Sequence, residues 1–132
     1  MEEVGAIVVG AGVVGLAVAR ALALDGHDVM ILEREQQFGT VTSSRNSGVI
    51  HAGLYYPDGS LKAQFCVEGR HLLYDFCEKR GIAHRRCGKL IIAGSEEEFP
   101  ALDAVMAHGA AAGVGDLVRL DPDGGRALEP AL

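Results

Sequence analysis

A glycine-rich turn between two apolar runs constrains this chain more than any other feature. The turn Gly10-Ala11-Gly12-Val13-Val14-Gly15 follows the run 6–9, precedes a stretch with helical spacing that stops near Gly26, and is followed by a second run at 29–32. Short apolar runs of this kind are typical of parallel strands buried on both faces. The pattern predicts an α/β fold with a parallel sheet, built on a Rossmann-like βαβ unit.

Each glycine has its own role in such a turn. Gly10 permits the tight turn, Gly12 leaves room for a pyrophosphate, and Gly15 lets the helix lie close to the sheet. The helix N-terminus binds the anion with free N–H groups and its dipole. Glu33 ends the second run about 20 residues further on, where a carboxylate accepts hydrogen bonds from ribose hydroxyls and repels a 2′-phosphate. The pattern therefore favours FAD or NAD over NADP.

Composition excludes several classes of partner. A formal net charge of −6 argues against a nucleic-acid-binding surface. The apolar stretch 5–19 is broken by glycines and meets Arg20, so it is too short to span a membrane. The 3 cysteines form no CxxC pair, which predicts reduced thiols in a cytoplasmic protein, with peripheral attachment to a membrane left open. The histidines show no ligand spacing with the cysteines, so no metal is expected.

A polar stretch and a histidine follow the second apolar run. The polar residues fit either a solvated loop or a wrapping around the far half of a cofactor longer than the ADP moiety of NAD; they are Thr42, Ser43, Ser44, Arg45, Asn46 and Ser47. His51 lies among small residues at 48–53, which allow a planar ring to lie on the backbone. This histidine is either structural or a donor to a ring carbonyl or a substrate carboxylate.

The rest of the chain predicts further helices and strands. A helix is expected over 61–80, with Ser60 as its cap, Gly81 at its end and an apolar stripe facing a core. A second helix runs to about residue 112 and starts either at a capping box of Ser95 and Glu98 or nearer Phe99. Strands are expected at 87–93 and 118–120, and a helical turn at 124–128.

Several blocks of the chain resemble FAD-dependent oxidoreductases of the D-amino-acid oxidase and glycerol-3-phosphate dehydrogenase superfamily. The likeness is greatest to the L-2-hydroxyglutarate oxidase and dehydrogenase group. It rests on GAGVVGLAVARALALDGHDVMILERE at 10–35, TSSRNSGVIHAGLYYPDGSLKAQFCVEGRHLLYDFC at 42–77, HRRCGKLIIA at 84–93 and LEPAL at 128–132. The first block is shared by many flavoproteins, whereas the second and third are more specific.

The resemblance implies a role for each matched residue. The FAD diphosphate would lie on Gly10, Gly12 and Gly15, the adenosine ribose on Glu33, and the adenine beside Arg34. Val13 and Val14 would also belong to the cofactor-binding residues. The residues Thr42, Ser43, Ser44, Arg45, Asn46 and Ser47 would line the second phosphate, the ribityl chain and the flavin edge. Gly48 and His51 would lie near the flavin ring, with Ala52 as a further cofactor-binding residue and His51 as the candidate catalytic residue facing the substrate.

The resemblance also implies a domain division and a reaction. Residues 1–82 would be the N-terminal part of an FAD-binding domain and 83–132 the beginning of a substrate-binding domain. The chain would be an N-terminal part of a longer enzyme, with an incomplete fold and no turnover of its own. That enzyme would oxidise a small 2-hydroxy acid, such as L-2-hydroxyglutarate, to the 2-oxo acid by hydride transfer to flavin, with oxygen or a quinone as acceptor.

Several alternatives and unknowns stay open at this point. The chain could belong to a flavoenzyme that oxidises amino acids or glycerol 3-phosphate, to an NAD-dependent dehydrogenase, or to a nucleotide-binding module without an active site. The catalytic base and the oligomeric state are not indicated by the sequence.

Overall fold

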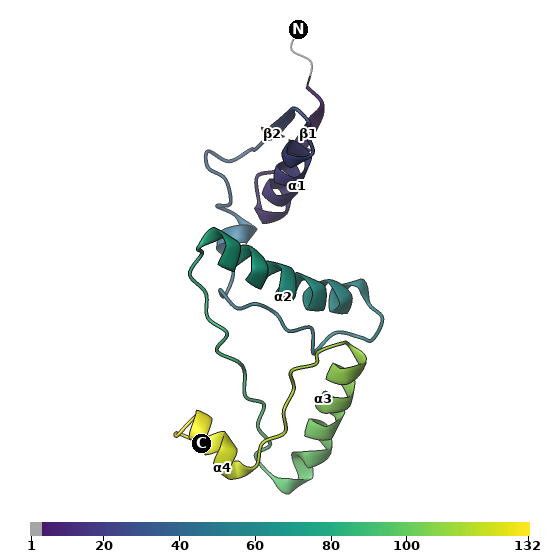
Figure 1. Cartoon of the computed structure of the whole chain (residues 1–132), viewed down its shortest axis with the longest axis vertical. Coiled ribbons are helices and arrows are strands. Elements are labelled where there is room, and N and C mark those ends of the chain that lie inside the picture. The colour runs from purple at the N-terminus through teal and green to yellow at the C-terminus, as the bar shows by residue number, and fades with distance from the viewer. Residues whose placement is uncertain (1–3) are drawn as a thin grey trace. The chain divides into compact units, whose positions relative to one another are not determined.

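The computed structural model describes residues 4–132, so the first three residues of the predicted FAD-binding part lie outside it. The chain forms two compact units, Met1–Val49 and Ile50–Leu132 (Figure 1). These units are defined by contacts within this chain, whereas the predicted boundary at residues 82 and 83 concerns the domains of a longer enzyme. That boundary stays a prediction.

The first unit contains the expected βαβ arrangement. Strand β1 (Ala6–Val9) leads into helix α1 (Val13–Leu24), and strand β2 (Val29–Leu32) returns parallel to β1. The register pairs Ala6 with Val29 and Val9 with Leu32, and α1 packs against both strands. A short 3₁₀ helix, η1 (Thr42–Ser44), follows in the loop after β2. The α/β class with a parallel sheet is confirmed, although only part of such a fold is present.

The two strands are less buried than their sequence predicts. Ile7 is 57% exposed and Val9 is 83% exposed, so the prediction of strands covered on both faces is wrong for this chain. Burial on both faces requires a helix layer on each side of the sheet. Helix α1 is the helix that packs against the sheet in the described part of this unit.

The second unit contains the longer helices. Helix α2 (Leu61–Arg80) begins and ends as expected, because Ser60 Oγ accepts the Ala63 N–H at 3.2 Å and Gly81 adopts the left-handed conformation. A 3₁₀ turn, η2 (Glu96–Glu98), leads into α3 (Phe99–Ala111), so the start nearer Phe99 is confirmed. Helix α4 (Pro122–Leu128) extends the expected helical turn.

The predicted capping box before α3 is not formed. The Ser95 side chain makes no capping bond. The Glu98 carboxylate instead accepts a hydrogen bond from the Gly94 N–H at 2.7 Å. The acid thus stabilises the preceding turn, and Pro100 in the first turn of α3 removes one N–H that would need a cap.

The strands predicted at 87–93 and 118–120 are absent from the described residues. A strand is stable only when its N–H and C=O groups pair with a neighbour, and neither segment has such a partner here. Segment 84–89 is instead held by its side chains, since Arg86 lies 4.2 Å from the Tyr74 ring centre on α2. A local β pattern is therefore not sufficient to form a sheet in this unit.

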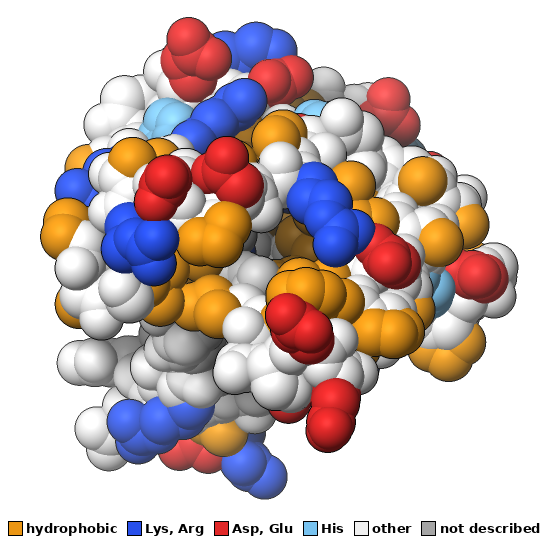
Figure 2. Space-filling view, turned by 90° about the horizontal axis from the view of Figure 1, so that it is seen from below, with side chains coloured by type: hydrophobic (Ala, Val, Ile, Leu, Met, Phe, Trp, Pro, Cys, Tyr) orange, Lys and Arg blue, Asp and Glu red, His pale blue; other side chains and the backbone are white. Residues whose placement is uncertain are grey.

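The apolar stripe of α2 does not form the core that its spacing predicts. Phe65 is 62% exposed and Leu72 is 69% exposed, whereas Cys77 is buried. Hydrophobic side chains accordingly lie at the surface among charged ones (Figure 2). Within residues 4–132, no helix is both long enough and apolar enough to cross a bilayer.

Candidate cofactor-binding site

The glycine turn is shaped by its backbone. Gly10 has a φ of +98°, which side-chain-bearing residues rarely adopt. A Cβ added to Gly15 would lie 1.9 Å from the Gly10 carbonyl oxygen, so only glycine lets the start of α1 close against the turn. A Cβ on Gly12 would lie 3.1 Å from Ser43 Oγ. Glycine is thus required at position 10 by its backbone conformation and at position 15 by close packing, and a side chain at position 12 would press against Ser43.

The loop after β2 folds back over the turn. The Gly39 N–H donates to the Ala11 carbonyl at 2.9 Å, and the Val13 N–H at the start of α1 donates to Ser43 Oγ at 2.9 Å. Ser43 therefore supplies the oxygen that satisfies an unpaired helix N–H. A phosphate oxygen can accept the same type of bond from a helix N–H, so the N-terminus of α1 is suited to bind an anionic group.

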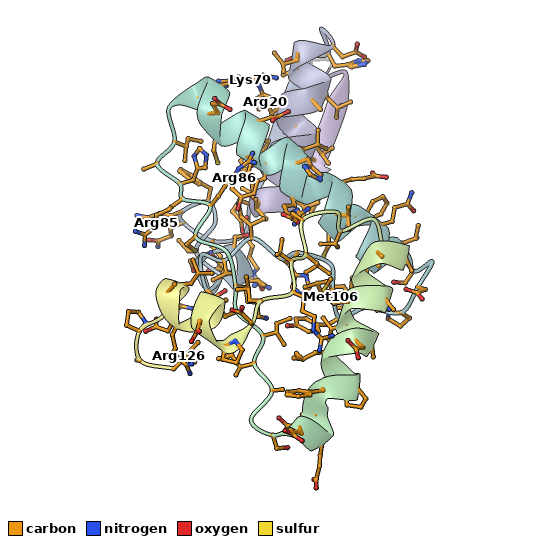
Figure 3. All side chains as sticks on the ribbon, turned by 60° about the horizontal axis from the view of Figure 1, so that its bottom comes forward. Arg20, Lys79, Arg85, Arg86, Met106 and Arg126 are labelled. Carbon is orange, nitrogen blue, oxygen red and sulfur yellow. The ribbon has the colours of Figure 1, made fainter. Side chains whose placement is uncertain are left out.

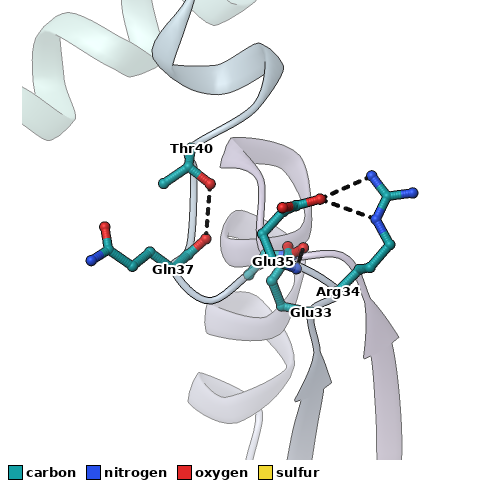
Figure 4. A network of polar contacts seen from close by, with 6 residues as sticks. Glu33, Arg34, Glu35, Gln37 and Thr40 are labelled. Atoms are coloured by element: carbon teal, nitrogen blue, oxygen red, sulfur yellow. Dashed lines mark hydrogen bonds and ion pairs between the residues drawn. The ribbon is translucent and has the colours of Figure 1, made fainter.

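Glu33 lies beside the same turn and is held by backbone donors (Figure 4). Its Oε1 accepts the Glu35 N–H at 2.9 Å and its Oε2 accepts the Ala11 N–H at 2.6 Å. The bond from Glu35, followed by that from Ala11, lowers the pKa of the Glu33 carboxyl below its ordinary value. The group is ionised at neutral pH, and each oxygen keeps a lone pair for a further donor.

A cavity of about 160 Å³ connects these parts of the site. Its wall comes from the turn, the end of β2 and the loop that follows: Gly12, Glu33, Gln37, Gly39, Thr40, Val41, Thr42 and Ser43. The structure thus brings together four of the predicted site residues and adds Gln37, Gly39, Thr40 and Val41. The volume is below the 300–1,000 Å³ typical of whole ligand pockets.

Other predicted site residues lie away from this cavity. Arg34 pairs with Glu35 at 3.0 Å, and its side chain is 87% exposed. Ser44 Oγ donates to the carbonyls of Thr40 and Val41, and Asn46 bonds the backbone of Ser43 and Gly48. Val14, Arg45 and Ser47 are exposed and are not part of the cavity wall. Their proposed contacts with FAD stay predictions.

His51 and Ala52 belong to the second unit. The His51 ring stacks on Tyr56 with centroids 4.7 Å apart and meets the Tyr55 ring edge-on at 6.2 Å. Its Nδ1 accepts the Gly53 N–H at 2.9 Å. A neutral imidazole that accepts at Nδ1 carries its proton on Nε2, so His51 offers a hydrogen-bond donor at Nε2.

Metal ligands are not gathered in the described part of the chain. No group of 3 or more His, Cys, Asp or Glu residues within 4–132 is placed to hold an ion. Cys66, Cys77 and Cys87 are all free thiols.

The chain belongs to the family described as FAD dependent oxidoreductase (DAO), which it matches over residues 6–132. Its relatives include the mitochondrial L-2-hydroxyglutarate dehydrogenase of Arabidopsis thaliana, 53% identical over 131 residues that make up 99% of this chain and 27% of that protein. The human protein of the same name is 43% identical over 126 residues, 94% of this chain and 27% of that protein. The Pongo abelii protein is 44% identical over 94% of this chain and 30% of its own length.

These relationships confirm the resemblance found in the sequence and identify FAD as the cofactor of the family. The chain spans about 27–30% of the length of these relatives, in agreement with the expectation that it corresponds to part of a longer enzyme.

The prediction of a cytoplasmic protein is contradicted by the same comparisons. The relatives are named as mitochondrial enzymes. Free thiols indicate a reducing surrounding but do not distinguish one reducing compartment from another, and cellular address is carried by segments that are separate from the folded domain.

Proposed function

We propose that this chain supplies the dinucleotide-binding turn of an enzyme that oxidises L-2-hydroxyglutarate to 2-oxoglutarate with FAD. The observation that carries the proposal is the 53% identity to an L-2-hydroxyglutarate dehydrogenase over 99% of this chain. The turn supports it, because Gly12, which precedes α1, lines one cavity together with Glu33 and Ser43.

The residues present fit the adenosine diphosphate half of FAD. The N-terminus of α1, with the hydroxyl of Ser43 at its first N–H, would hold the diphosphate. Glu33 would accept hydrogen bonds from the ribose hydroxyls with the lone pairs that its backbone donors leave free. When bound, the flavin supplies the acceptor for the hydride.

His51 would act on the substrate as a donor. Since its Nδ1 already accepts the Gly53 N–H, Nε2 carries the proton of the neutral ring and can donate to a substrate carboxylate. In that tautomer Nε2 has no lone pair for the hydroxyl proton. We therefore assign His51 to substrate positioning and the general base to another residue of the enzyme.

Reduction of the bound flavin tests this function directly. The full-length protein, purified with its flavin, should lose its yellow absorbance under anaerobic conditions when L-2-hydroxyglutarate is added. The D-enantiomer, glycerol 3-phosphate and amino acids serve as controls and should leave the flavin oxidised. Bleaching by one of these controls alone would replace the proposed substrate. A purified protein without flavin that binds NAD reversibly would replace the proposed cofactor.

A further inference from the structure

Two tyrosine rings contact His51 in the second unit, and a lysine lies over each ring; we call Lys62, Lys89, Tyr55 and Tyr56 the lysine–tyrosine cluster. Lys62 Nζ lies 4.3 Å from the ring centre of Tyr56, and Lys89 Nζ lies 4.5 Å from that of Tyr55. The same two rings contact the His51 imidazole. The cluster thus links the first turn of α2 and segment 87–93 to His51 through the two tyrosines of the loop before α2.

The cations of this cluster have no carboxylate partner. Among residues 4–132 neither lysine forms an ion pair with an acidic side chain. Asp58, in the turn before α2, pairs instead with His108 at 3.0 Å. Both lysines and His51 are exposed. Two positive charges without an acidic partner therefore lie over the two tyrosine rings that contact His51.

The tyrosine rings restrict where these charges can lie. A cation within about 6 Å of a ring centre is attracted to the ring face, which reduces the entropy lost when a ligand fixes the side chain. Such an arrangement suits a small dianion. One carboxylate would meet the His51 N–H, and a second carboxylate a few carbon atoms away would meet the lysines.

We infer that Lys62 and Lys89 select a dicarboxylate substrate by binding the carboxylate farther from the hydroxyl group. The inference rests on the proposed function and adds the residues that distinguish 2-hydroxyglutarate from 2-hydroxy acids with one carboxylate. Neither lysine belongs to the cofactor-binding turn, and each is assigned here to specificity only.

Steady-state kinetics of the full-length enzyme tests this assignment. The substrates are L-2-hydroxyglutarate and L-2-hydroxypentanoate, which has the same carbon chain and a methyl group in place of the distal carboxylate. Lys62→Gln and Lys89→Gln should each raise KM for the dicarboxylate about tenfold, as expected for the loss of one charged hydrogen bond. The kcat should change less than twofold, and kcat/KM for the monocarboxylate should stay constant. Lys→Arg at either position should restore most of the selectivity.

Lys79→Gln provides the matched control, because it removes a lysine from the other end of α2, where Figure 3 shows it. It should leave both substrates unaffected. An unchanged ratio of kcat/KM values in the Lys62 and Lys89 variants would overturn the assignment. Equal losses for both substrates would overturn it as well, since they would indicate a general effect on the fold.

A binding measurement separates this inference from the proposed reaction. Glutarate has both carboxylates and no hydroxyl to oxidise, and pentanoate has one carboxylate. Titration of the flavin spectrum should show glutarate binding more tightly than pentanoate, with the difference lost in Lys62→Gln and Lys89→Gln. If the enzyme fails to oxidise 2-hydroxyglutarate but shows this pattern, the reaction is wrong and the dicarboxylate site stands. If glutarate has no advantage, the dicarboxylate site is wrong.

Discussion

Glu33 shows how one side chain can be prepared for a ligand by the backbone around it. Both of its oxygens accept backbone N–H groups, from Glu35 and from Ala11 of the glycine turn. These bonds fix the carboxylate beside the cavity and favour its ionised form, so its pKa lies below the ordinary value. A ribose would meet an acceptor that is already oriented.

We predict that Glu33→Gln weakens FAD binding by the full-length protein roughly tenfold to a hundredfold at neutral pH, as expected when a charged acceptor is lost. The amide also places a donor where the Ala11 N–H needs an acceptor. Fluorescence titration of the apoprotein with FAD measures the affinity. Glu68→Gln, an exposed change on α2, is the control and should bind FAD like the parent. Equal affinities of all three proteins would remove the ribose contact.

The lowered pKa of Glu33 also predicts a pH dependence. Because the folded pKa is below the unfolded one, the contribution of Glu33 to stability is complete above the ordinary carboxyl pKa of about 4.5 and is lost as pH falls through the lower folded value. Urea unfolding of the parent and of Glu33→Gln should therefore differ at pH 6 and converge in acid. A difference that grows on acidification would show that the pKa shift has the opposite sign.

At the scale of the element, the turn and α1 depend on close backbone packing. Gly15→Ala would place a methyl group against the Gly10 carbonyl oxygen, and backbone atoms cannot move aside cheaply. We expect a loss of about 1–3 kcal/mol in stability, the usual cost of overpacking, together with weaker FAD binding. Thermal unfolding followed by circular dichroism measures the first effect and flavin content the second.

Gly69 offers the opposite case within α2. A Cβ there meets no atom within 4 Å, so Gly69→Ala should stabilise the helix by up to about 1 kcal/mol, because alanine has a higher helix propensity than glycine.

A Gly15→Ala protein that is as stable as the parent would contradict the close packing of α1 against the Gly10 carbonyl.

The elements that the sequence predicted well are those fixed by local signals. Helix α2 begins at Ser60 and ends at Gly81 because a cap and a left-handed glycine act within a few residues. The strands expected at 87–93 and 118–120 did not form, since a strand depends on a partner that the local pattern cannot specify. The cavity residues Gln37, Gly39, Thr40 and Val41 were missed for a similar reason, because they reach the turn only when the Gly39 N–H bonds the Ala11 carbonyl.

At the scale of the whole molecule, the buried apolar residues are few and small compared with those left exposed. The buried apolar residues of the described chain are Ala11, Ala19, Leu54, Ala63, Cys77 and Val114, and no side chain has less than 2% of its surface exposed. Large side chains on β1 and α2 remain accessible, among them Val9 at 83% and Leu72 at 69%. Burial of such groups is the main source of folding free energy, so this segment alone gains little of it.

We therefore predict that residues 1–132 produced alone bind the dye ANS strongly and unfold over a broad range of urea concentration, as chains with exposed apolar surface and loose packing do. The relatives are more than three times as long, and the full-length protein should bind little dye and unfold in a steep transition. Both proteins are compared at equal molar concentration, with and without FAD. If the isolated segment unfolds as steeply as the full-length protein and binds no more dye, the prediction is wrong, because its apolar side chains are then covered in solution.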